Sequence, residues 1–111
     1  MEADRPDAVL VQPSLPTKRV AEFAIRYRIP TVSIIGVFAT DGGLMAYQTA
    51  EIDLYRQSAS YVDKILRGAK PADLPIQQPT KFELIINMKT AKAIGLTIPP
   101  AFLARADEVI E

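Results

Sequence analysis

The residues that could support chemistry are few, and none falls into a catalytic pattern. The chain has no histidine and no cysteine, so it lacks the usual proton shuttle at neutral pH, the commonest metal ligand and any thiol nucleophile. Serines such as Ser14 and Ser33 have no histidine base, and no nucleophile-elbow sequence surrounds them. We therefore expect a protein that is not an enzyme and that carries neither a cofactor nor a metal.

Two acidic or glycine-rich clusters have simpler explanations than a reactive site. Asp41-Gly42-Gly43 could bring backbone N–H groups close to an anion, but the lysine and the spacing of a phosphate-binding loop are absent. Because glycine reaches positive φ at low cost, we favour a plain turn. Glu51 and Asp53 lie two positions apart, so they do not face each other on a helix. Interaction with the helix dipole explains them better.

Composition argues against several classes of partner. Thirteen basic residues balance thirteen acidic ones in 111 residues, which gives no long-range positive field and speaks against nucleic-acid binding. The first residues lack the basic head and apolar stretch of a secretory signal, so the chain as written is expected to be cytoplasmic. We interpret the basic residues of the first helix as part of a solvated outer face. They are Lys18, Arg19, Arg26 and Arg28.

The elements that must position these residues indicate an α/β fold with a parallel βαβ core. Residues 8–11 form a β-branched run, typical of a strand buried on both faces. Residues 18–28 show helical spacing of apolar side chains, and a second strand is predicted over 31–35. Short connections between strand, helix and strand favour a parallel pair. The apolar positions of the predicted helix are Val20, Phe23, Ala24 and Tyr27.

The whole chain, 1–111, is interpreted as a single truncated domain. Its predicted parts are a βαβ unit with a hinge-side loop over 8–47, a long helix over 48–68, a proline-rich connector over 69–80, and a strand with short helices over 81–111. The strand that begins at Phe82 alternates polar and apolar residues, which suits an edge or half-covered position. One face of the long helix is apolar, and its Tyr55 is expected to pack in a core. The residues of this face are Ile52, Tyr55, Ala59, Val62, Ile65 and Leu66.

Topology singles out the candidate binding residues. In parallel α/β sheets, ligands bind beyond the carboxyl ends of the strands. Tyr47 lies beside the glycine turn, where its ring could equally stack on a ligand or pack in a core. The loops Gln12-Pro13-Ser14 and Gly36-Val37-Phe38 follow the first two predicted strands, so polar groups and one aromatic ring could converge on a ligand there. The alternative, that these are simply strand-ending loops, has about equal weight.

Longer segments resemble a known family. The resemblance is strongest from Tyr61 to Pro75 and extends through 43–47, 78–87 and 89–99. In these segments the sequence is similar to the ABC transporter substrate-binding proteins of the tryptophan-binding-like group, and the match runs from the first strand to the tail at 108–110. The resemblance implies part of a type I periplasmic-binding fold, in which two Rossmann-like lobes close on a small solute and present it to an ABC permease. It also implies a bacterial, periplasmic protein.

The resemblance further implies roles for individual positions. Family chains are much longer, and this chain corresponds to about their final third, so the other wall of the cleft and the export signal would lie outside it. The sequence departs from the family at Ala46, where serine is common, and at Gln48, where glycine is frequent. Ligand-side positions would be Gln12, Ser14, Phe38 and Tyr47, with Gly42 and Gly43 at the hinge or turn.

Three hypotheses follow for function. The principal one is a carboxy-terminal fragment of a solute-binding component that takes an amino-acid-like or other small organic solute and works by lobe closure. A ligand-sensing or interaction domain of the same fold is the second. A truncated product without ligand binding is the third, and its signature would be an exposed apolar face. Uncovered helix faces and sheet edges also predict a homo-oligomer, formed through the exposed lobe interface by exchange of the long helix or the Phe82 strand.

Overall fold

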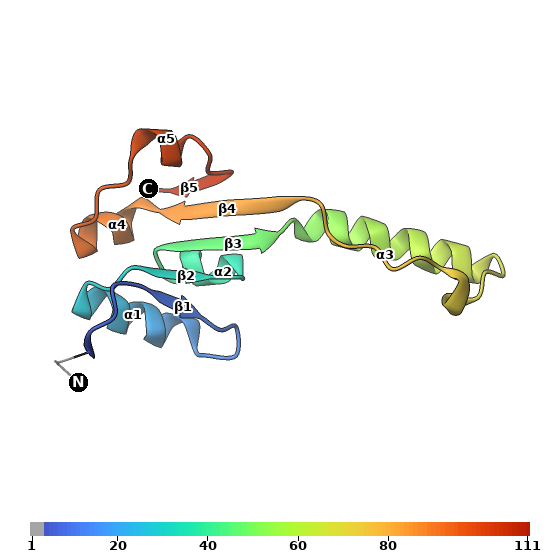
Figure 1. Ribbon diagram of the computed structural model, residues 1–111, viewed down its shortest axis with the longest axis horizontal. Helices are drawn as coiled ribbons and strands as arrows, with labels where there is room; N and C mark the ends of the chain where they lie inside the picture. Colours follow the sequence, from blue (N-terminus) through green and yellow to red (C-terminus); the bar gives the residue numbers. More distant parts are fainter. Residues whose placement is uncertain (1–3) are drawn as a thin grey trace. The chain divides into compact units, whose positions relative to one another are not determined.

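The computed structural model describes residues 4–111 and divides the chain into two compact units (Figure 1). Unit 1 consists of the residues up to Gln48 together with Glu83–Glu111, and unit 2 consists of Thr49–Phe82. The strands form one sheet in the order β1-β2-β3-β4-β5. The fold class predicted from the sequence, α/β with a parallel βαβ core, is confirmed.

The βαβ core occupies the beginning of unit 1. It consists of β1 (Val9–Val11), α1 (Thr17–Tyr27) and β2 (Thr31–Ser33), and β1 pairs with β2 in parallel. Helix α1 ends because Arg28 adopts the left-handed conformation, with φ 52°, and because the residue before Pro30 is disfavoured in a helix. The short connections place the two strands side by side, as the sequence pattern predicts.

A short helix that the sequence pattern does not predict follows β2. Helix α2 (Gly36–Thr40) leads through a turn into β3 (Met45–Thr49), which pairs in parallel with β2. Gly42 in this turn has φ 110°, a conformation that other residues adopt only with strain. A Cβ at Gly43 would lie 2.1 Å from Cε1 of Phe38, so the turn is packed directly on the α2 side chain.

Of the two positions expected for the fourth strand, edge or half-covered, the edge position is wrong. Strand β4 (Phe82–Asn87) lies between β3 and β5 (Glu108–Ile110) in the sheet. It runs antiparallel to β3 (Figure 1) and pairs in parallel with β5. The last residues of the chain supply this extra neighbour. Helices α4 (Met88–Ile94) and α5 (Pro100–Leu103) connect the two strands.

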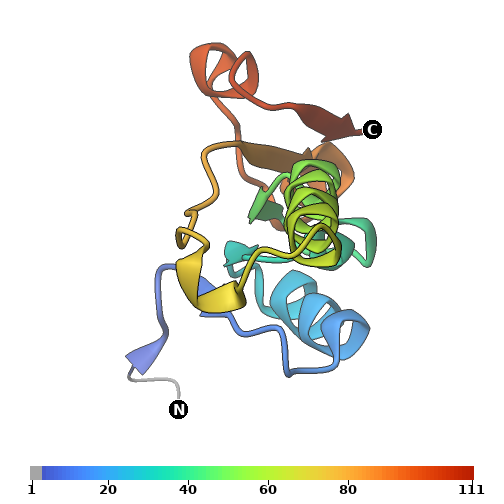
Figure 2. The same cartoon turned by 90° about the vertical axis from the view of Figure 1, so that its right-hand side faces the viewer.

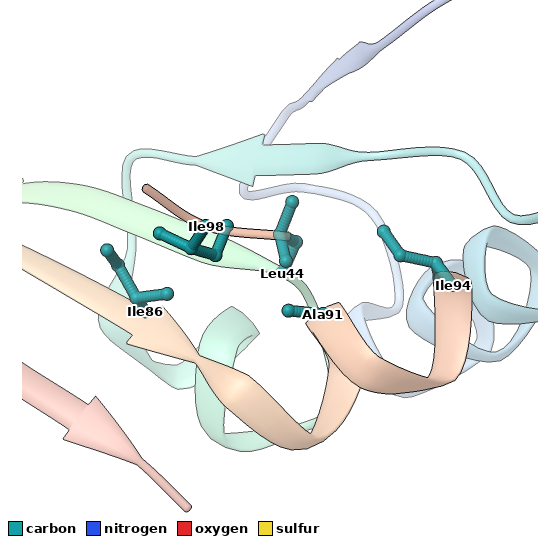
Figure 3. Close-up of a cluster of buried hydrophobic side chains, with 5 residues drawn as sticks. All are labelled: Leu44, Ile86, Ala91, Ile94 and Ile98. Atoms are coloured by element: carbon teal, nitrogen blue, oxygen red, sulfur yellow. The ribbon is translucent and has the colours of Figure 1, made fainter. Parts of the chain in front are cut away.

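The hydrophobic core of unit 1 has its largest cluster around α4. Figure 3 shows the side chains of Leu44, Ile86, Ala91, Ile94 and Ile98 gathered beside that helix. Side-chain hydrogen bonds fix the helix beside them: Asn87 Oδ1 accepts from Thr90 N at 3.1 Å and Asn87 Nδ2 donates to Ala39 O at 2.8 Å. Two smaller clusters lie against α1 and α2.

Burial differs from the sequence expectation on β1 and α1. Strand β1 is not buried on both faces, since Leu10 is 69% exposed. The reason is that β1 packs through Val9 and Val11 against α1 and α2, while Leu10 between them projects from the opposite face of the strand. On α1, Phe23 and Tyr27 are largely exposed and stack on each other, with ring centroids 6.1 Å apart.

Unit 2 is a long helix with a returning connector. Helix α3 (Glu51–Leu66) is followed by the 3-10 turn η2 (Pro71–Asp73), and the chain then runs back beside α3 (Figures 1 and 2). Ala50 N donates to Lys81 O at 3.0 Å, and the Tyr61 hydroxyl donates to Pro75 O. The expectation that Tyr55 packs in a core is wrong, because α3 buries none of its side chains and Tyr55 is 72% exposed. Within residues 4–111 no helix is both long and apolar enough to cross a membrane.

Candidate functional site

Strand register places several candidate residues at one edge of the sheet. Val11 pairs with Ser33, and Ser33 pairs with Ala46. Because the three strands are parallel, the next residues along them, which are Gln12, Ile34 and Tyr47, come to the same side. Two of the four ligand-side positions proposed from the sequence, Gln12 and Tyr47, are thus brought into one row.

Exposure separates the four proposed ligand-side residues. Gln12 and Ser14 are exposed, and Tyr47 is 53% exposed. Phe38 is fully buried and packs with Val11 and Ala21. Its ring therefore supports α2 from inside unit 1 and offers no surface to a solute. Leu15, Ile34 and Val37, three more exposed apolar side chains, come from the loops and helix that follow β1 and β2.

A glutamine bridge fixes the carboxyl end of β3. Gly36 N donates to Gln48 Oε1 at 2.6 Å, and Gln48 Nε2 donates to Glu83 Oε2 at 3.1 Å. One amide side chain thereby joins the start of α2, the end of β3 and the start of β4. A Cβ at Gly36 would meet Gln48 Oε1 at 2.9 Å, so a larger residue at that position would have to displace the end of the Gln48 side chain.

The buried polar groups of unit 1 serve the fold. Ser33 Oγ donates to Val11 O at 2.9 Å, and Thr90 Oγ1 donates to Gly42 O at 2.8 Å. Among the described residues every buried side-chain nitrogen and oxygen has a hydrogen-bond partner. No cluster of three or more acidic side chains able to hold a metal occurs in that part of the chain. What the strand edge offers is hydrogen-bonding groups and apolar surface, which are the means of non-covalent binding.

Sequence reasoning missed Gln48 and Glu83 as part of this edge. Gln48 carried one signal, since it stands where the resembling family frequently has glycine. Glu83 carried none, because its place opposite Gln48 follows from the antiparallel pairing of β3 and β4, which no local pattern specifies. The turn glycines Gly42 and Gly43 lie between α2 and β3, at the amino end of β3 and therefore at the opposite end of that strand from this edge.

The sheet and its carboxyl edge define a class of protein. Unit 1 is an α/β unit in which loops after parallel strands gather exposed polar and apolar groups, the arrangement of proteins that bind ligands beyond their strand ends. A family model for ABC transporter substrate binding proteins matches residues 9–110. The chain belongs to this family. A search of curated proteins finds no match.

Solved structures agree with this assignment. A conserved domain protein from Vibrio cholerae O1 biovar El Tor is 25% identical, with a TM-score of 0.84, and the similarity covers 93% of this chain and 36% of that one. The ABC domain of Streptococcus pneumoniae in complex with L-Trp is 27% identical, with a TM-score of 0.81, and the corresponding coverages are 96% and 38%.

A third structure shares the fold at lower identity. It is the ligand-free, open form of a substrate-binding protein with adhesive properties from Clostridium difficile, with 20% identity, a TM-score of 0.70 and coverages of 93% and 36%. In each comparison at least 93% of this chain is matched, but it spans little more than a third of the other protein.

Proposed function

We propose that this chain contributes one wall of a solute-binding cleft, and that the strand edge with Gln12, Ser14 and Tyr47 faces the solute. The family match over residues 9–110 is the observation that carries the proposal. The parallel register supports it, because it brings Gln12 and Tyr47 to the edge at which α/β sheets bind ligands. Binding is non-covalent and non-catalytic, and delivery to an ABC permease completes the transport role.

The chemistry of the edge favours a small organic solute with both polar and apolar parts. Gln12 and Ser14 offer hydrogen-bonding groups, and Tyr47 offers a ring with a polar tip. Exposed Ile34 and Val37 add apolar surface beside them. An amino acid with a large side chain combines these needs, and the similar Streptococcus pneumoniae domain was solved with L-Trp.

The experiment is a thermal-unfolding screen of the protein with each amino acid, followed by titration calorimetry of any hit. A solute present at about 100 times its Kd adds about 2.7 kcal/mol to the free energy of unfolding, which raises Tm by several degrees in a domain of this size. Tyr47→Ala should then weaken the affinity about tenfold or more, because aromatic anchors dominate small binding sites.

The matched control is Tyr27→Ala. Tyr27 is 52% exposed, close to the 53% of Tyr47, but lies on α1, so its removal should leave affinity unchanged. A folded protein whose Tm no amino acid raises by more than about 1 °C at millimolar concentration would contradict solute binding by this chain. Equal losses of affinity in both tyrosine variants would contradict the proposed edge.

A second candidate function is interaction without solute binding. It is favoured by the exposed apolar face of α3, which is the feature expected of a truncated product or an interaction domain. The two candidates separate in the same screen: a specific amino acid raises Tm only under the first. Under the second, Tm responds to protein concentration and not to solutes.

A further inference from the structure

The carboxylate of Glu83 lies at the carboxyl end of β3, beside the candidate strand edge. Strands β3 and β4 run antiparallel (Figure 1), and Asn87 N donates to Leu44 O at 2.8 Å. Four residues further along β3 and four residues back along β4 stand Gln48 and Glu83, so these two residues lie directly opposite each other. Opposite residues project to the same face of a sheet, which explains why their side chains meet.

The backbone of Gly36 decides which way the amide of Gln48 points. Gly36 N can only donate, so the atom of the Gln48 amide that lies 2.6 Å from it is the oxygen. The amide nitrogen then faces β4, and Gln48 Nε2 donates to Glu83 Oε2 at 3.1 Å. One oxygen of the Glu83 carboxylate is thereby held close to the segment that follows β2, where ligands of α/β sheets bind.

The carboxylate of Glu83 has no cationic partner within residues 4–111. The ion pairs in that part of the chain use Asp53 and Asp63 as their acids. Glu83 is half-buried, and among the described residues its carboxylate accepts a hydrogen bond from Gln48 alone, although a carboxylate has about four acceptor positions. Hydrogen bonds between a carboxylate and a cation are the strong ones. Glu83 therefore offers a place for a positively charged group.

An amino acid supplies such a group. Its amine is mostly protonated at neutral pH, and an ammonium is a compact donor of up to three hydrogen bonds. Gln12 and Ser14 are uncharged, so Glu83 is the negatively charged group beside the residues proposed to face the solute. Tyr47 and Gln48 are consecutive in β3 and point to opposite faces. A solute beside the end of β3 can thus direct its side chain toward Tyr47 and its amine toward Glu83.

We propose that Glu83 is a specificity-determining residue of the solute site and that its carboxylate binds the protonated primary amine of the solute. Gln48 holds one oxygen of the carboxylate and leaves the other for the amine. The inference rests on the proposed function, because it concerns a contact with the same solute. It narrows the solute class to small organic molecules with a primary amine, and otherwise identical molecules without the amine bind weakly.

The test is titration calorimetry of the full chain with two probes that differ only in the amine. The first is the amino acid that raises Tm most in the thermal screen, and the second is its analogue with hydrogen in place of the amine, such as indole-3-propionate for L-Trp or 3-phenylpropionate for L-Phe. The wild-type protein should bind the amino acid about tenfold more tightly than the analogue, as expected for one hydrogen bond between charged groups.

Glu83→Gln removes the charge and keeps an oxygen that can accept from Gln48. It should lower the affinity for the amino acid about tenfold and leave the affinity for the analogue within about twofold. The matched control is Glu108→Gln. Glu108 is exposed on β5, where it pairs with Ile85, so this variant removes the same charge from the neighbouring strand and should keep both wild-type affinities.

A measurement on the wild-type protein needs no variant. The side-chain amide of Gln48 donates to Glu83, so its ¹⁵N resonance should shift when the amino acid is added and should not shift with the analogue. Equal affinities of the wild-type protein for the two probes, unchanged affinity for the amino acid in Glu83→Gln, or an equal loss in Glu108→Gln would overturn the role of Glu83 while solute binding stands. Failure of every amino acid to raise Tm would contradict the proposed function, and the role of Glu83 with it.

Discussion

At the scale of single residues, close packing of a glycine on an aromatic ring decides the turn before β3. Gly43→Ala would place a Cβ 2.1 Å from the Phe38 ring, and Phe38 is fully buried with no room to retreat. We expect a loss of about 2–3 kcal/mol in the free energy of unfolding, the cost of overpacking. Urea denaturation followed by circular dichroism measures it.

Gly95→Ala is the comparison for that substitution. Gly95 ends α4 with φ 75° and has no atom within 4 Å of an added Cβ, so the variant suffers only backbone strain of about 1 kcal/mol. If Gly95→Ala proves as destabilising as Gly43→Ala, the contact with Phe38 is not what requires glycine at position 43.

A second residue-scale prediction concerns Asn87. Its side chain caps α4 through Thr90 N and donates to Ala39 O, and it is almost fully buried. Asn87→Ala should cost about 2–4 kcal/mol, the sum of a lost cap and a buried carbonyl left without a donor. The control is Lys89, an exposed residue in the first turn of the same helix. Lys89→Ala should change the free energy of unfolding by less than about 0.5 kcal/mol in the same denaturation experiment.

At the scale of elements, the glutamine bridge holds three of them together. Gln48→Met keeps the size of the side chain but removes the acceptor for Gly36 N and the donor to Glu83. We expect a loss of about 1–2 kcal/mol and faster hydrogen exchange of the Gly36 amide than of amides in β2. Gln78→Met on the exposed connector is the control. An unchanged exchange rate at Gly36 would show that water replaces the bridge without cost.

Local sequence patterns predicted those helices and strands that can be recognised from their own residues alone. The β-branched run of β1, the helical spacing of α1 and the proline after it gave the βαβ core. Helix α2 was not predicted, because its five residues begin with glycine and are too few to show a period. Strand β5, with three residues, is defined only by its pairing with β4. The predicted edge position of β4 was wrong for the same reason, because no local pattern shows that β5 pairs with it.

The candidate site was predictable to the extent that it depends on topology. Parallel strands bring Gln12 and Tyr47 to one edge. The pattern of strands was sufficient to expect Gln12 there, whereas Tyr47 was proposed from the glycine turn beside it and from the family resemblance. Phe38 could not be placed without α2, since the helix turns its ring inward. The bridge from Gln48 to Glu83 requires the register of an antiparallel pair 35 residues apart, which sequence periodicity does not encode.

At the scale of the whole molecule, the helical spacing of apolar residues predicted helix α3 correctly but did not predict whether its apolar face is buried. The apolar stripe of α3 was expected to form a core through Tyr55, and it is exposed. Periodicity shows that one face of a helix needs a partner, but it does not show which segment supplies the partner. In the relatives that this chain matches, more than 60% of each protein lies outside the matched part.

Helix α3 should therefore be less stable than the sheet. A helix of 16 residues that buries no side chain gains little from packing, and isolated helices of about this length are marginal in water. We expect its amides to exchange through local opening, at free energies well below those of β2 and β3 amides. Hydrogen-exchange mass spectrometry measures both sets of amides in one sample. Protection of α3 equal to that of the sheet would mean that contacts within the chain stabilise the helix.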